Sequence, residues 1–157
     1  MTIGRENFLR TRLIPTLQQI NPDTKPLWGQ MSLHHMVEHM ADVLMVASGH
    51  LKMELVTPVE KLPVYREFLM SDKPFKENTK SPVLPKELIP LRTQTLTAAI
   101  GKLQEETIRF FEAFEKNPQL KTMHPAFGEL DFNENVQVLY KHALHHLKQF
   151  GVEPQLV

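Results

Sequence analysis

The stretch from Phe132 to Phe150 constrains the fold more than any other part of the chain. Its apolar residues recur at spacings of three and four, the period of an amphipathic α-helix. They are Phe132, Val136, Leu139, Tyr140, Ala143, Leu147 and Phe150. Because such a stripe has to be buried against other elements, the spacing predicts one helix of a packed helical domain.

Three histidines lie near the end of this predicted helix. His142 and His146 are four residues apart, so their side chains stack on one face, one turn apart. At about 100° per residue, His146 lies roughly 60° and His142 roughly 100° from the centre of the stripe, whereas His145 should face water. Two inward imidazoles can share a metal ion through neutral nitrogens. The commoner explanation for such a pair seen alone is surface or helix-terminal histidines, some of them favoured by the helix dipole.

Apolar periodicity predicts three further long helices, over residues 6–20, 33–49 and 92–116. Pro15 interrupts the first of these helices. Trp28, the only tryptophan, is expected to anchor the core beneath the second helix, and Glu106 in the third helix is expected on a solvated face. Ser32 is a suitable N-cap for the second, and Gly49 is a natural stop. His39 in the second helix lies about 80° from the centre of its apolar face, and His35 lies about 120° away. His39 is therefore the better placed to reach inward, although His35 and His39 form a rival pair at four-residue spacing.

A proline-rich crossover, residues 50–91, joins the second and third helices. Within it, residues 64–70 could form a short helix, and its length would let the two flanking helices run parallel. Candidates for a pocket wall in the crossover are Tyr65, Phe68, Phe75 and Asn78. A turn-rich link over residues 121–131 is expected to join the third and fourth helices. The predicted fold class is therefore all-α, a four-helix bundle with a long crossover between helices 2 and 3, in a single domain over residues 1–157.

Composition excludes several classes of function. The chain has 157 residues, with 18 Lys plus Arg against 18 Asp plus Glu, and no basic block that would favour nucleic-acid binding. Without cysteine there can be no disulfide, thiolate metal site or cysteine nucleophile. No segment resembles a signal peptide or a membrane span, so a cytoplasmic location is expected. The HExxH motif of zinc proteases is also absent.

Two stretches resemble the DinB/YfiT-like family of proposed metal-dependent enzymes. The first, PLWGQMSLHHMVEHM, ends with His39 at the position of the family's helix-two ligand. The second, from His124 to Gly151, is similar to a signature H-P-x-F-G followed by H-x-x-H-H-x-x-Q-F-G. The family shares its name with a DNA polymerase but has no functional link to it.

The resemblance implies a compact four-helix bundle, often dimeric, with a divalent transition metal held by His39, His142 and His146. The helical-wheel positions favour the same three residues. Zinc and nickel are the favoured metals, although an all-nitrogen site also suits copper or ferrous iron. The segment 124–128 is expected to shape the entrance. Candidates for supporting the ligands or lining the pocket are His35, His124 and His145.

The favoured function is a hydrolase that uses a metal-activated water at this site. Three imidazoles leave a fourth position for water, whose pKa the metal lowers to about 7. Two alternatives stay open: a metal-dependent thiol transferase, and a non-catalytic bundle that binds a small ligand. The expected partner is a small-molecule substrate or a low-molecular-weight thiol, without nucleic acid or membrane, and a homodimer is a further expectation. Candidates for a general base are His35, His50, His124 and His145.

Overall fold

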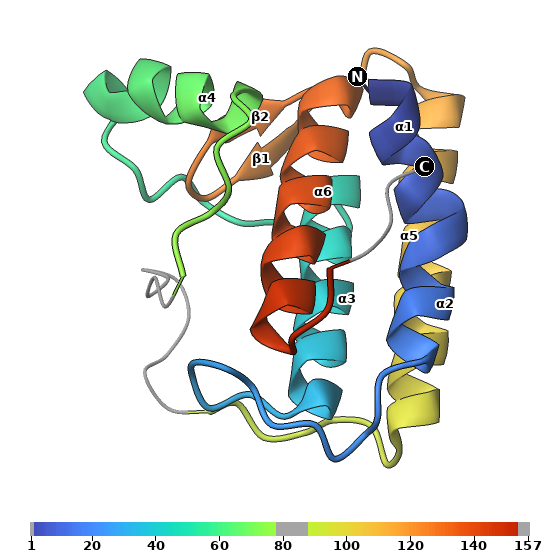
Figure 1. Cartoon of the computed structure of the whole chain (residues 1–157). Helices are drawn as coiled ribbons and strands as arrows, with labels where there is room; N and C mark the ends of the chain where they lie inside the picture. The colour runs from blue at the N-terminus through green and yellow to red at the C-terminus, as the bar shows by residue number, and fades with distance from the viewer. Residues whose placement is uncertain (1, 78–87, 154–157) are drawn as a thin grey trace.

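The computed structural model describes residues 2–77 and 88–153 and is mostly helical, with one small antiparallel sheet. The long helical segments lie alongside one another (Figure 1): α1 (Thr2–Asn7), η1 (Phe8–Arg12), α2 (Leu13–Gln18), α3 (Leu33–Ser48), α5 (Leu96–Lys116) and α6 (Phe132–Gln149). Across one end lie the 3-10 helix η2 (Val59–Lys61), α4 (Leu62–Met70), and the strands β1 (Thr122–His124) and β2 (Gly128–Leu130). The prediction of a helical fold is confirmed, and the sheet departs from a purely α fold.

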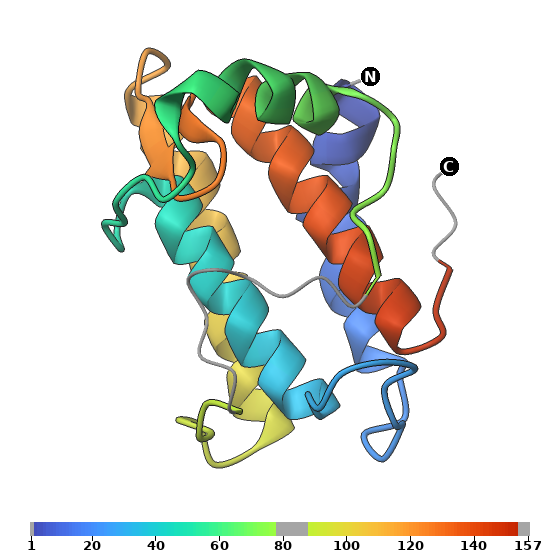
Figure 2. The same cartoon turned by 90° about the vertical axis from the view of Figure 1, so that its left-hand side faces the viewer.

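Three of the predicted long helices form close to their expected bounds. The Ser32 hydroxyl accepts a hydrogen bond from the backbone N–H of His35 at the start of α3, and Gly49 ends that helix at φ 79°. Thr95 caps α5, which therefore begins later than predicted, and Asp131 caps α6. Figures 1 and 2 show α3 and α5 running in the same direction, an arrangement that the long crossover allows. None of the described helices is long and apolar enough to cross a membrane.

The first helical stretch passes Pro15 without ending, because the helix widens just before it. Segment η1 is a π-helix, in which the backbone N–H of Leu13 donates to the carbonyl of Phe8. A proline ring crowds the carbonyl four residues earlier and supplies no N–H, and a π-turn is a common local adjustment to such a break. The predicted interruption is therefore a change of helix type within residues 2–18.

The apolar stripes of the long helices face one shared core, in which Phe110, Leu103 and Leu139 are fully buried. Two side chains depart from the sequence-based expectation. Trp28, expected to anchor the core, is only partly buried and lies at its edge. Glu106, expected on a solvated face of α5, is 0% exposed, and its carboxylate lies 2.9 Å from the ammonium of Lys102. The ion pair with a partly exposed lysine on the same helix compensates that burial.

The hairpin between α5 and α6 replaces what the sequence indicated as a turn-rich link. Thr122 pairs with Leu130 and His124 with Gly128, whose φ of 84° favours glycine. The buried side chain of Asn135 on α6 donates to the carbonyl of Leu130, which ties the hairpin to the helix. The hairpin, which carries His124 at the end of β1, is thereby held against α6.

Candidate metal centre

The side chains of His39 on α3 and of His142 and His146 on α6 converge on one point. The Nε2 atom of His142 lies 3.1 Å from Nε2 of His39 and 2.9 Å from Nε2 of His146. One nitrogen from each ring lies within 4.8 Å of the other two. We refer to these three residues as the histidine cluster. The structure thus brings together the same side chains that the sequence singled out, although His39 and His142 are 103 residues apart in the chain.

The donor atoms of the histidine cluster fit a divalent transition metal. Imidazole nitrogens bind zinc at about 2.0–2.1 Å, and a tetrahedral arrangement then separates neighbouring nitrogens by about 3.3 Å. The separations of 2.9 and 3.1 Å are a few tenths of an ångström shorter. A small spreading of the rings would therefore accommodate an ion, and three imidazoles are a donor set of known catalytic zinc sites.

Burial keeps the three rings uncharged. It lowers the pKa of His39 to about 4 and the pKa of His146 to about 3. Burial also lowers the pKa of His142 well below its usual value, with further lowering by the neighbouring imidazoles, because a second positive charge at this distance is unfavourable. At neutral pH all three rings are therefore neutral, which is the form that binds a metal.

A buried amide fixes the orientation of His146. Its Nδ1 lies 2.8 Å from Oε1 of Gln149, and Nε2 of Gln149 donates to the carbonyl of Trp28 at 2.9 Å. Because the amide nitrogen is used by Trp28, the amide oxygen faces His146 and can only accept. The proton of His146 is therefore on Nδ1, which leaves the lone pair of Nε2 directed at the shared point.

Gln149 was missed in the sequence analysis, although a signal was available. It follows His146 by three residues, so the two side chains lie on one face of α6. Gln149 is 4% exposed, and a polar residue on the inner face of an amphipathic helix needs a hydrogen-bonding partner. That position and the neighbouring histidine together would have indicated a supporting role.

His145 does not face water as predicted, and this expectation is wrong. Its ring is half-buried, with its centre 5.4 Å from the ring of Trp28 and 6.3 Å from that of Phe75. Burial lowers the pKa of His145, opposed by a hydrogen bond to the backbone of Phe75. The loop before α3 and the segment after α4 fold over this face of α6, so the supposed outer face of the helix is covered.

Two other candidate histidines lie apart from the cluster. The Nδ1 atom of His35 lies 2.6 Å from the Ser32 hydroxyl, so this ring completes the cap of α3. His35 does not belong to the group of three possible metal ligands that contains His39. His50 is exposed beyond the opposite end of α3. Neither His35 nor His50 has a described contact with the cluster.

An aromatic group covers one side of the histidine cluster. The ring of Phe75 meets His142 edge-on at 6.0 Å and stacks with Phe68 at 5.9 Å and with Phe127 at 6.3 Å. Tyr65 lies 6.4 Å from Phe127. The predicted wall residues of the crossover therefore gather near the cluster, except Asn78, which lies outside the described residues. The surroundings of His142 on this side are apolar.

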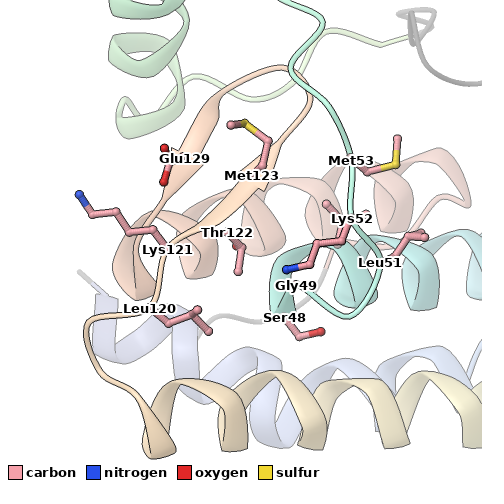
Figure 3. A pocket seen from close by; sticks show the side chains of 11 residues that line it. Ser48, Gly49, Leu51, Lys52, Met53, Leu120, Lys121, Thr122, Met123 and Glu129 are labelled. Carbon is pink, nitrogen blue, oxygen red and sulfur yellow. The ribbon is translucent and has the colours of Figure 1, made fainter.

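Two cavities lie away from the three nitrogens. Figure 3 shows one of about 260 Å³ between the end of α3 and the hairpin, with Lys52, Lys121 and Thr122 among its lining residues. A larger cavity of about 460 Å³ lies along α6, and Phe75 and His145 line it. None of the cluster histidines lines either cavity. Phe75 and His145 connect the larger cavity to the cluster, because their rings contact His142 and His146.

No protein-family model, no curated protein and no solved structure gives a significant match to this chain.

Proposed function

We propose that the protein is a metal-dependent hydrolase, built on a four-helix bundle of the DinB/YfiT-like type. The observation that carries the proposal is the convergence of three neutral Nε2 atoms, from His39, His142 and His146. Histidines that served only to cap helices or to face water would have no reason to meet at one point. The three rings would hold zinc or nickel, and such an ion would activate a bound water or polarise a carbonyl.

Each residue around the proposed ion has a separate role. The three imidazoles supply uncharged donors, so a divalent ion would keep its full charge and favour an anionic ligand at the remaining position. Gln149 holds His146 in the required tautomer through the Nδ1 contact at 2.8 Å. Phe75 and its aromatic neighbours exclude water from one side of His142, which strengthens electrostatic interactions there.

Thiol transfer is the second candidate reaction, because no described carboxylate forms a hydrogen bond or ion pair with the histidine cluster. Within residues 2–77 and 88–153, no Asp or Glu makes a hydrogen bond or ion pair with the histidine cluster. A reaction at this site would therefore depend on the metal to lower the pKa of the bound nucleophile, whose proton would pass to the solvent. A thiol, with a pKa of about 8.5, loses its proton more readily than water does.

Metal content tests the proposal directly. The protein, purified without a histidine tag and exposed to zinc or nickel, should retain about one ion per chain after dialysis, measured by elemental analysis. The His142→Ala variant should retain little, whereas His50→Ala, which removes an exposed histidine outside the cluster, should bind as the wild type does. A wild type that holds no metal, or equal retention by His142→Ala, would contradict the proposal.

Activity assays then distinguish hydrolysis from thiol transfer. Chromogenic ester and phosphoester substrates test for hydrolysis, and consumption of glutathione in the presence of an electrophile tests for thiol transfer. In either case activity should disappear with a chelator and return with the metal. Turnover that persists unchanged after chelation would contradict a metal-dependent enzyme, and binding of a small ligand by the metal-free chain would then favour a binding protein.

A further inference from the structure

His124, at the end of β1, is held by the backbone of its own turn. The N–H groups of Ala126 and Phe127 lie 3.0 and 3.3 Å from Nδ1 of His124. A backbone N–H can only donate, so Nδ1 is an acceptor. A neutral imidazole carries one proton, which must therefore be on Nε2, on the side of the ring away from the turn.

The same contacts disfavour a positive charge on this ring. Protonation would place an N–H on Nδ1 of His124, directly against two backbone N–H donors. Burial acts in the same direction and lowers the pKa of His124 to about 4. His124 is therefore an uncharged donor across the physiological pH range.

The Nε2 atom of His124 is free to bind a ligand. Within the described part of the chain, no hydrogen bond to this atom is found. Among the same residues, only the carboxylate oxygens of Glu106 are fully buried polar side-chain atoms without a hydrogen-bond partner. The Nε2–H group of His124 is thus neither satisfied by described protein atoms nor fully enclosed.

The hairpin brings this donor to the side of the histidine cluster. The ring of His124 lies 4.9 Å from that of Phe127, which stacks on Phe75, and Phe75 in turn meets His142 edge-on. His124 is also close enough to His142 for its charge to lower the pKa of that residue. The turn, the aromatic group and the cluster are therefore linked by a series of neighbouring rings.

We infer that His124 is a fixed, uncharged N–H donor that binds the anionic ligand of the metal, and that it is not the general base of the site. The inference rests on the proposed function, because the anion would be held jointly by the ion and by Nε2–H. The ligand class is a small anion or an anionic substrate group, such as a carboxylate. Nε2 carries the proton and Nδ1 is engaged by the turn, so this ring has no free lone pair with which to accept a proton.

Two substitutions of His124 distinguish its role as an Nε2–H donor from its role as an acceptor within the turn. In His124→Asn, the amide oxygen can replace Nδ1 as acceptor for Ala126 and Phe127, while the donor at Nε2 is lost. In His124→Gln, the amide reaches the position of Nε2 and restores a donor there. His50→Asn removes an exposed histidine and serves as the control.

The probe is azide added to the cobalt(II)-loaded protein, with affinity measured from the visible spectrum of the ion. We expect His124→Asn to weaken azide binding about tenfold or more, as loss of a hydrogen bond to a charged group predicts. His124→Gln should recover much of that affinity, and His50→Asn should not differ from the wild type. Equal azide affinity in the wild type and His124→Asn, with cobalt still bound, would overturn the inference alone. Failure of the wild type to bind cobalt would instead count against the proposed function.

A second readout needs no metal. Nitrogen-15 NMR of the histidine-labelled protein should show Nδ1 of His124 unprotonated and Nε2 protonated, without titration between about pH 5 and 8. A proton on Nδ1, or titration near the ordinary value of about 6.5, would overturn the inference whatever the cobalt result.

Discussion

The Nδ1 atom of His146 lies 2.8 Å from Oε1 of Gln149, and the same amide donates to the backbone of Trp28. This contact joins the loop before α3 to a member of the histidine cluster. Gln149 also accepts at its own carbonyl from the N–H of Leu27, at 2.7 Å. The loop is therefore attached twice to the end of α6, and it supports the side chain that points His146 at the shared centre.

Removing the side-chain amide of Gln149 should weaken metal binding, although all three histidine ligands stay in place. We expect Gln149→Leu to lower metal affinity by about 10–100-fold, as loss of such supporting contacts to a metal ligand typically does. Competition with a coloured chelator would measure the change. Gln149→Glu keeps an acceptor for Nδ1–H and should lose less affinity. Lys148→Leu, at an exposed neighbouring position, should have no effect. Unchanged affinity in Gln149→Leu would show that His146 is oriented by other contacts.

Acid should destabilise the metal-free protein. The pKa values of His39 and His146 are lowered to about 4 and about 3, whereas in the unfolded chain they return to about 6.5. Below pH 6.5 the unfolded state therefore binds more protons, and stability falls as the pH drops from about 6.5 to about 4. One unit of pKa lowering corresponds to about 1.4 kcal/mol. We expect the free energy of unfolding to fall by a few kcal/mol between about pH 7.5 and 5.

Urea unfolding at several pH values would measure this dependence. The His142→Leu variant should lose less stability in acid than the wild type, because one of the rings held neutral by burial is absent. His50→Ala should follow the wild type, since that ring is exposed. A wild type whose stability did not change between about pH 7.5 and 5 would contradict the assignment of buried neutral rings.

Sequence periodicity predicted the long helices and the inward histidines because both depend on the position of a residue around its own helix. His39, His142 and His146 could be identified in this way. The environment of His145 could not, since Phe75 and Trp28 cover it from segments distant along the chain. A helical wheel describes one helix and contains no information about what folds over it.

The hairpin and the buried carboxylate were missed for different physical reasons. Each strand has three residues, too few to show the alternation of a half-buried strand. Glu106 lies beside the apolar stripe of α5 and is buried because the helix packs closely on that side, with Lys102 compensating its charge. Tertiary contacts, rather than local preference, decide both features.

Glu38 should be essential for attaching the end of the crossover to α3. Its carboxylate is 7% exposed and accepts from the backbone N–H groups of Arg92, at 3.0 Å, and of Thr93, at 2.7 Å. Glu38→Ala would leave two N–H groups without their acceptor. We expect a loss of about 2–4 kcal/mol in the free energy of unfolding, measured by urea titration.

The matched control for this substitution is Asp42→Ala. Asp42 also binds Arg92, through the guanidinium at 2.8 Å, but the arginine side chain is 55% exposed. Exposed ion pairs contribute about 0–1 kcal/mol, so this variant should stay close to the wild type. Equal losses for Glu38→Ala and Asp42→Ala would show that the backbone contacts of Glu38 do not dominate.

Asn135 should determine how firmly the hairpin, and with it His124, is held against α6. Its buried amide nitrogen lies 3.0 Å from the Thr122 hydroxyl and 3.1 Å from the carbonyl of Leu130. Asn135→Ala leaves these acceptors inside the protein without a donor, so we expect a loss of about 1–3 kcal/mol in stability. Faster hydrogen exchange at the β1–β2 amides should accompany it. Asn133→Ala, at an exposed position of the same helical turn, should change neither quantity. Unaltered exchange in Asn135→Ala would mean that apolar packing alone fixes the hairpin.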